Sequence, residues 1–251
     1  MTKVVVPDSI LNKVDKPARY IGGELNSSKK EITPELTRVA FCFPDVYEVG
    51  MSHLGMQILY HFFNRREDVY CERVFAPWTD MEQIMREEKL PLFSLETHTA
   101  LKAFDFVAFT LQYEMSYTNI LNMLELAHIP IYSKDRTEED PIIIAGGSCA
   151  YNPEPLAPFI DIFYIGEGEV SYDELFDKYK IWKKGGGKKK EFLAQIANIE
   201  GIYIPAFYEE VYNEDGTIKE KRRTHPEAKA PIKKVIVKDI DNVFYPEVQV
   251  V

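Results

Sequence analysis

Acidic residues, glycines and a histidine stand in short polar stretches, and each of these stretches follows an apolar run. Asp45, Glu48 and His53 occupy the first stretch and could form an acid–base set or a metal site. A single histidine without HxH or HExxH spacing is a weak metal signal, however, and no nucleophile–base pair accompanies it. We therefore assign no catalytic residue and no metal ligand to this chain.

Two further stretches carry paired glycines. Gly146-Gly147 and Gly166-Glu167-Gly168 each end an apolar run, where glycine permits positive φ and a close approach of the backbone to a ligand. Neither is a GxGxxG or a Walker sequence, so a nucleotide phosphate site is poorly supported. The alternative is that both stretches are tight turns and that Glu167 and Glu169 cap the helix that follows.

The central apolar run, residues 104–111, ends in a polar group of residues. Gln112-Tyr113-Glu114 and Tyr117 come directly after it. Because the carboxyl ends of parallel strands form the ligand-binding edge of such folds, these side chains are predicted to line a pocket.

The elements that would position these stretches follow from the apolar pattern. Strands are predicted at residues 39–43, 69–76, 104–111, 141–145 and 160–165. The runs 39–43 and 104–111 read as buried strands, whereas 69–76 is predicted from its alternation. Helices are predicted at 52–64, 79–89, 116–129, 172–182 and 191–199, with N-caps at Ser52 and Ser116 and a capping box at Thr79–Glu82.

This alternation predicts an α/β fold. We expect a flavodoxin-like or Rossmann-like doubly wound, mostly parallel five-stranded sheet of order 2-1-3-4-5 with right-handed crossovers. That order brings four loops to one edge of the sheet, namely residues 45–55, 112–117, 146–152 and 166–169. The polar stretches would meet there.

The α/β unit is expected to span residues 38–200, between two less regular parts. Residues 1–37 are predicted to form an N-terminal arm and linker, with a short helix at 10–14 and an extended turn at 17–24. Residues 201–251 are predicted to contain a β-hairpin, 207–212 with 217–223 around an Asp-Gly turn, and one more strand at 233–239. The apolar terminus suggests a piece cut from a longer protein.

Composition narrows the class of protein. The chain has 251 residues, 45% of them apolar, and a net charge of -10, which argues against nonspecific binding to nucleic acid or to anionic membranes. No apolar run approaches the roughly 18 residues of a transmembrane helix, so we expect a cytoplasmic protein. Cys42 and Cys71 lie in apolar runs and are predicted core residues, and Cys149 has no identifiable base beside it.

The loops together resemble a known family. Asp45-Val-Tyr47-Glu-Val-Gly50 resembles the Asp-x-His-x-x-Gly loop of cobalamin-binding domains, with tyrosine in place of histidine. Gly146-Gly147 and Ile165-Gly-Glu-Gly-Glu169 resemble the later loops of the cobalamin-binding-like domain that precedes many radical S-adenosylmethionine (SAM) enzymes. The longer phrases 47–55, 111–119 and 146–155 resemble an uncharacterised bacterial branch of that family, and the resemblance covers roughly residues 36–251.

The resemblance implies a cobalamin-binding site at the sheet edge. Its residues would be Asp45, Tyr47, Gly50, Ser52, Gln112, Tyr113, Gly146, Gly147, Gly166, Glu167 and Gly168. Ser52 and the Gly146-Gly147 loop would flank the dimethylbenzimidazole tail. A phenol, with a pKa near 10, is a poor cobalt ligand at neutral pH, so the lower face of the cobalt would lack a histidine unless His53 supplied one.

The resemblance also has a limit. Radical SAM chemistry needs a CxxxCxxC loop that holds a 4Fe-4S cluster, and the sequence contains none. This chain alone is therefore not expected to be the enzyme. The resemblance implies an accessory N-terminal domain that covers its own C-terminal barrel, which would bind the cluster, S-adenosylmethionine and an unknown substrate.

Two alternatives remain open at this point. The first is a ligand-free scaffold or protein-interaction module of the same fold. The second is a free-standing flavodoxin-like enzyme that uses Asp45, Glu48 and Glu114. The second is weaker, because no nucleophile–base pair can be named.

Overall fold

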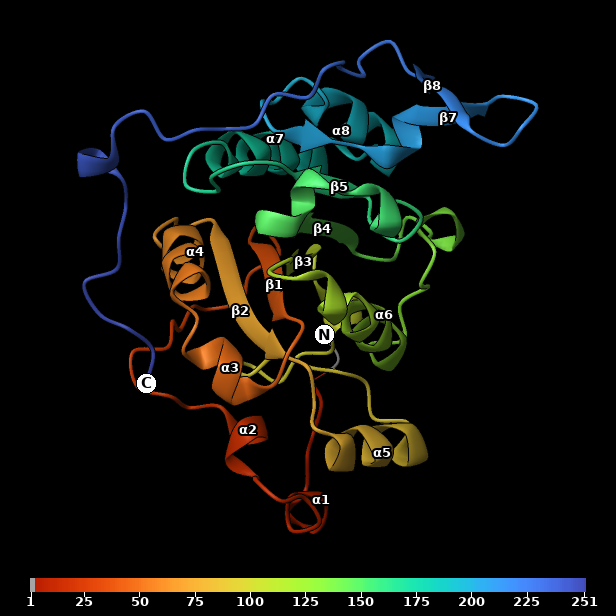
Figure 1. The fold of residues 1–251 in the computed structure, drawn as a ribbon. Coiled ribbons are helices and arrows are strands. Elements are labelled where there is room, and N and C mark those ends of the chain that lie inside the picture. Colours follow the sequence, from red (N-terminus) through yellow and green to blue (C-terminus); the bar gives the residue numbers. More distant parts are fainter. Residues whose placement is uncertain (1–2) are drawn as a thin grey trace.

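Six strands form the central sheet of the computed structural model, which describes residues 3–251 (Figure 1). They are β1 (Thr37–Phe43), β2 (Val69–Phe75), β3 (Phe106–Thr110), β4 (Ile142–Gly146), β5 (Ile162–Tyr164) and β6 (Ile202–Tyr203). The order is β2-β1-β3-β4-β5-β6, with the first five parallel and β6 antiparallel to β5. The predicted order is confirmed, and β6 adds an edge strand that the sequence did not predict.

Helices cover both faces of this sheet, as in a doubly wound fold. One face carries α4 (Leu54–Asn64), α7 (Tyr172–Gly185) and α8 (Lys189–Ile196). The other carries α5 (Thr79–Glu88) and α6 (Tyr117–Leu126). Every residue of β1 is buried, which explains why its residues 39–43 read as one apolar run.

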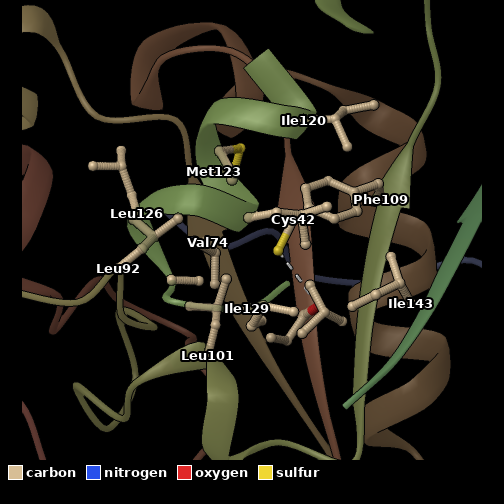
Figure 2. Close-up of a cluster of buried hydrophobic side chains, with 14 of the residues drawn as sticks. Cys42, Val74, Leu92, Leu101, Phe109, Ile120, Met123, Leu126, Ile129 and Ile143 are labelled. Atoms are coloured by element: carbon tan, nitrogen blue, oxygen red, sulfur yellow. Dashed lines mark hydrogen bonds between the residues drawn. The ribbon is translucent and has the colours of Figure 1, made fainter. Parts of the chain in front are cut away.

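Figure 2 shows part of the core between the sheet and α6. Cys42 lies among Val74, Phe109 and Ile143, and its thiol contacts the carbonyl of Ala40 at 3.7 Å. Burial raises the pKa of the Cys42 thiol well above its ordinary value. The prediction that this cysteine is a core residue is confirmed, as it is for the buried Cys71.

The N-terminal part is more helical than predicted. It contains α1 (Asp8–Leu11) and α2 (Ala18–Ile21), and the second replaces the extended turn expected there. Residues 1 and 2 of the predicted arm lie outside the described residues. Short 3-10 turns complete the fold at Leu101–Ala103, Glu114–Ser116, Ser133–Asp135, Ser148–Tyr151, Glu154–Leu156, Pro205–Phe207 and Ile240–Asn242.

Three helix starts differ from the predictions. Residues expected in a loop form α3 (Tyr47–Met51), and the N-cap of α4 is His53 rather than Ser52. The Ser52 hydroxyl instead donates to the carbonyl of Val49 at 2.9 Å, which ends α3. The predicted capping box of α5 is wrong, because the N-cap is Trp78, one residue earlier.

The C-terminal part contains the predicted hairpin, β7 (Tyr208–Tyr212) paired with β8 (Ile218–Arg223). The prediction of a strand at residues 233–239 is wrong. This stretch forms one isolated parallel bridge among the described residues, between Val235 and Gly166 of the loop after β5. Within residues 3–251, no helix is long and apolar enough to cross a membrane.

Two side chains and one backbone N–H, not a further strand, form hydrogen bonds with the outer edge of β2. Asn64 accepts from the Cys71 N–H at 3.1 Å and donates to the Cys71 carbonyl at 2.9 Å. Glu96 accepts from the Arg73 N–H at 2.7 Å, and the Leu95 N–H donates to the Arg73 carbonyl at 3.0 Å. These groups of the edge strand are therefore already paired.

Candidate functional site

A pocket of about 250 Å³ lies at the carboxyl edge of the sheet, between α4 and α7. Its wall on the sheet side comes from β1, β3, β4 and β5, so it lies where the predicted loops meet. Doubly wound folds bind ligands at this edge. The pocket is therefore the candidate site.

Aromatic rings form much of the pocket wall. Tyr164 and Tyr172 stack with their centroids 4.5 Å apart, and Phe63 meets Tyr172 edge-on at 4.9 Å. Phe41 completes this wall from β1. Burial raises the pKa of both tyrosines, so their hydroxyls stay neutral at physiological pH. Flat, uncharged walls of this kind suit a planar apolar or aromatic group.

A chain of hydrogen bonds runs along the mouth of the pocket. The Met56 N–H donates to Nδ1 of His53 at 3.1 Å, and Gln112 hydrogen-bonds to the His53 side chain. Gln112 in turn contacts the Thr110 hydroxyl. Burial lowers the pKa of His53, which the bond to Gln112 partly opposes, so the imidazole is neutral at pH 7.

This arrangement fixes the tautomer of His53. Since Nδ1 accepts a hydrogen bond, the proton of the neutral ring is assigned to Nε2. A metal could bind Nε2 only if that proton moved to Nδ1, which would break the cap of α4. His53 is therefore committed to the helix start and is not a ready metal ligand.

The predicted glycines divide into two kinds. At Gly146 an added Cβ would lie 3.4 Å from the Tyr164 carbonyl, an ordinary contact, and would point toward the Tyr172 hydroxyl in the pocket wall. At Gly147, φ is +113° and an added Cβ would lie 2.7 Å from the Leu111 carbonyl oxygen. Gly147 is thus required by the backbone, whereas Gly146 leaves space that a ligand could use.

The structure brings only part of the predicted set together. Gln112, Gly146, Gly147, Gly166 and Gly168 line the pocket. The others lie outside its lining, and their contacts are structural. They are Asp45, which caps the Val46 N–H; Tyr47, which donates to Glu24; Gly50, packed on Phe75; Ser52; the half-exposed Tyr113; and Glu167, whose carboxylate accepts from the Val237 N–H.

Tyr47 belongs to a buried charged cluster. Its hydroxyl donates to Glu24 at 3.1 Å, and Glu24 pairs with Arg73 at 2.9 Å. Arg73 also pairs with Glu96 at 2.7 Å, and the side chains of Arg73 and Glu96 are 2% and 1% exposed. Burial, helped by Glu24, raises the pKa of Tyr47 to about 12. This tyrosine therefore holds the N-terminal arm and does not face the pocket.

Sequence reasoning missed the aromatic wall. Phe41, Phe63, Tyr164 and Tyr172 come from two strands and two helices, and each reads locally as an ordinary core residue. Glu169, considered as a cap, lines the pocket as well. No local pattern in the sequence distinguishes a ring that borders a cavity from one that fills the core.

Exposed apolar side chains surround this edge of the sheet. Val49 and Leu54 follow β1, Tyr113 and Met115 follow β3, Tyr151 follows β4 and Val170 follows β5. Their exposed fractions run from 46% for Val49 to 83% for Met115. We call these six residues the apolar rim.

The pocket lining holds two side chains of metal-binding type, His53 and Glu169. Within residues 3–251, no group of three or more His, Cys, Asp or Glu side chains could hold a metal ion. The pocket therefore offers ring stacking and hydrogen bonds from its mouth.

Comparisons with known proteins indicate the family of this chain. Residues 55–205 match a family model described as the N-terminal part of radical SAM proteins. A stretch of 139 residues is 27% identical to an uncharacterized protein of Methanocaldococcus jannaschii and covers 54% of this chain and 25% of that protein. The match thus spans about a quarter of the length of this curated relative. No solved structure matches the chain.

Proposed function

The chain belongs to the family of radical SAM proteins, whose N-terminal part it matches, and we propose that it is an accessory domain that covers the catalytic barrel. Full-length proteins of this family imply a 4Fe-4S cluster and S-adenosylmethionine. Residues 38–200 would form the covering domain and residues 201–251 the connection toward the barrel. The substrate is not part of the proposal, and the expected cytoplasmic location stays a prediction that fractionation would test.

The apolar rim carries this proposal. Large apolar side chains that gather on one edge of a domain mark a surface that another body covers. The matched relative has three-quarters of its length outside the aligned stretch, which leaves room for such a body in a protein of this kind. The rim and the pocket share the carboxyl edge of the sheet, so the covering body would face the pocket mouth.

Site-specific cross-linking tests this docking. A photoreactive phenylalanine analogue at position 115, in the rim, should cross-link to the barrel in a full-length protein. The same analogue at position 181 is the control, because Ile181 is 71% exposed on α7, outside the rim. Equal cross-linking from both positions, or none from position 115, would refute the proposed orientation.

We further propose that the pocket binds the planar tail of cobalamin. A cavity of about 250 Å³ with stacked aromatic walls accepts one planar ring system, and the corrin would have to lie over the mouth. Cobalamin, when bound, would supply a cobalt centre able to carry a methyl or other group. Gly146 and Gly168 would allow the close approach of the tail, and Gln112 would offer polar contact at the mouth.

The lower face of the cobalt would then have no histidine ligand from this chain. His53 keeps its proton on Nε2 to cap α4, and Tyr47 is bonded to Glu24 in the buried cluster. Neither side chain is therefore expected to serve as a ligand if cobalamin binds here.

Titration with hydroxocobalamin, followed by desalting, tests this second proposal. The wild-type chain should retain colour near one equivalent, and Gly146→Val should lose it because the added side chain enters the pocket without backbone strain. Gly185→Ala is the matched control, since an added Cβ there meets open space. No retained colour in the wild type, in the presence of the barrel, would favour the alternative of a ligand-free scaffold.

A further inference from the structure

Residues 233–251, here called the strap, leave the hairpin and run along the outside of α4 to the C-terminus beside the N-terminal arm (Figure 1). One end of the strap is bonded to the loop after β5. The Val235 N–H donates to the Ile165 carbonyl at 3.0 Å, and the Glu167 N–H donates to the Val235 carbonyl at 3.1 Å. Val235 is 2% exposed, and a Cβ on Gly166 would overlap its backbone.

That loop also forms one wall of the pocket. Gly166 and Gly168 face the pocket, and the Glu167 carboxylate between them accepts from the Val237 N–H of the strap. The loop is thus held by the strap on one side and borders the pocket on the other. Its backbone at Gly166 has φ of +122°, a conformation that glycine adopts without a side-chain clash.

The other end of the strap is bonded to α4, which forms the opposite wall. The Gln57 side chain accepts from the Val250 N–H at 3.1 Å and lies 5% exposed. Val251 and Leu25 of the N-terminal arm exchange two backbone hydrogen bonds at 2.7 and 3.1 Å. Gln57 stands two residues before Leu59, which lines the pocket.

The middle of the strap is held less firmly than its ends. Ile240 and Tyr245 are 79% and 70% exposed, and Phe244 contacts Phe62 edge-on at 5.8 Å. The two anchors therefore lie at opposite walls of the pocket and belong to one segment, whose middle packs on α4 through Phe244.

We propose that the strap links the two walls of the pocket. The loop at residues 165–169 is then more ordered when residues 249–251 are docked on α4, and less ordered when they are detached. A planar ligand between α4 and that loop would tighten both anchors. By linkage, docking of the strap would strengthen ligand binding by the same factor. The ligand part of this inference rests on the proposed cobalamin site, whereas the coupling between anchors does not.

Hydrogen exchange of the full chain tests the coupling without any ligand. Gln57→Leu removes the side chain that holds Val250 and leaves the backbone bonds between Val251 and Leu25. It should speed exchange roughly fivefold both at residues 250–251 and at the near anchor, residues 235–237 and 167. Gln83→Leu, on the exposed face of α5, is the matched control and should change neither. Faster exchange confined to residues 250–251 would overturn the coupling.

Phe244→Ala provides a second variant if Gln57→Leu fails to fold, because it loosens the middle of the strap and leaves both anchors intact. It should speed exchange at both ends, and unchanged exchange at 235–237 would again overturn the coupling. Hydroxocobalamin is then added to the wild type, where it should slow exchange at residues 250–251. If no colour is retained but the variants show coupled exchange, the cobalamin proposal fails and the strap proposal stands.

Discussion

Replacing Arg73 by methionine should destabilise the fold severely, because it strands two buried carboxylates. Glu96 and Glu24, 1% and 8% exposed, both pair with this guanidinium. Removing one partner of a buried ion pair typically costs about 3–5 kcal/mol, since the remaining charge keeps its desolvation cost. We expect Arg73→Met to lower the free energy of unfolding by about that amount at pH 8.

The loss should depend on pH in a defined direction. Burial raises the pKa of Glu96 even with Arg73 present, and removing the arginine raises it further. A carboxyl whose folded pKa lies above its unfolded value, about 4.3, destabilises the fold increasingly as the pH rises between those two values. The destabilisation of Arg73→Met should therefore be about 1–2 kcal/mol smaller at pH 5 than at pH 8.

Urea unfolding at both pH values, for the wild type and two variants, makes this measurement. Arg86→Met is the matched control, because Arg86 is 41% exposed and its pairs with Glu82 and Glu125 lie on the surface. It should cost less than about 1 kcal/mol at either pH. A loss for Arg73→Met that equals the control, or that is the same at both pH values, would refute this account of the buried cluster.

Three further predictions concern the site. Gly147→Ala should destabilise the fold by about 1–3 kcal/mol in thermal unfolding, because φ is +113° there, whereas Gly185→Ala should be neutral or slightly stabilising. An NMR titration should give His53 a pKa below the ordinary value of about 6.5. The neutral ring then contributes its full stabilisation above about pH 6.5, and this contribution is lost as the pH falls through the lowered pKa of the folded state. An unshifted pKa would contradict the role of His53 as a buried cap. Tyr47→Phe should lower the free energy of unfolding in urea by about 1 kcal/mol, because the hydrogen bond to Glu24 is lost, and should leave hydroxocobalamin retention unchanged. Loss of retention would show instead that Tyr47 contacts the ligand.

The sheet could be predicted because burial of its strands leaves a recognisable run of apolar residues in the sequence. Parallel strands covered on both faces need apolar residues at every position, so 104–111 and 141–145 stand out against the polar segments around them. The handedness of the crossovers then leaves few possible strand orders. The site could be placed at the carboxyl edge for the same reason.

The details of the site depend on partners far away in the chain, and no local pattern encodes these. Tyr47 lies in a sequence that resembles a cofactor-binding loop, yet its hydroxyl donates a hydrogen bond to Glu24 of the N-terminal arm. Gln57 reads as a surface residue of a helix, but it bonds Val250, which is 193 positions away. The N-cap of α4 is His53 and not Ser52, because the residues just before them already form α3.

The bonded edge of β2 has a consequence for the behaviour of the protein at high concentration. An open sheet normally presents at its edge a row of free backbone groups, onto which a second molecule can add a strand and start aggregation. Asn64 and Glu96 occupy those groups at Cys71 and Arg73. The strand that stays fully exposed is β8, and it carries Lys219, Lys221, Arg222 and Arg223. Like charges repel two such strands brought together, so occupied backbone groups protect the β2 edge of the central sheet and charge protects the separate β7–β8 hairpin from edge-to-edge association.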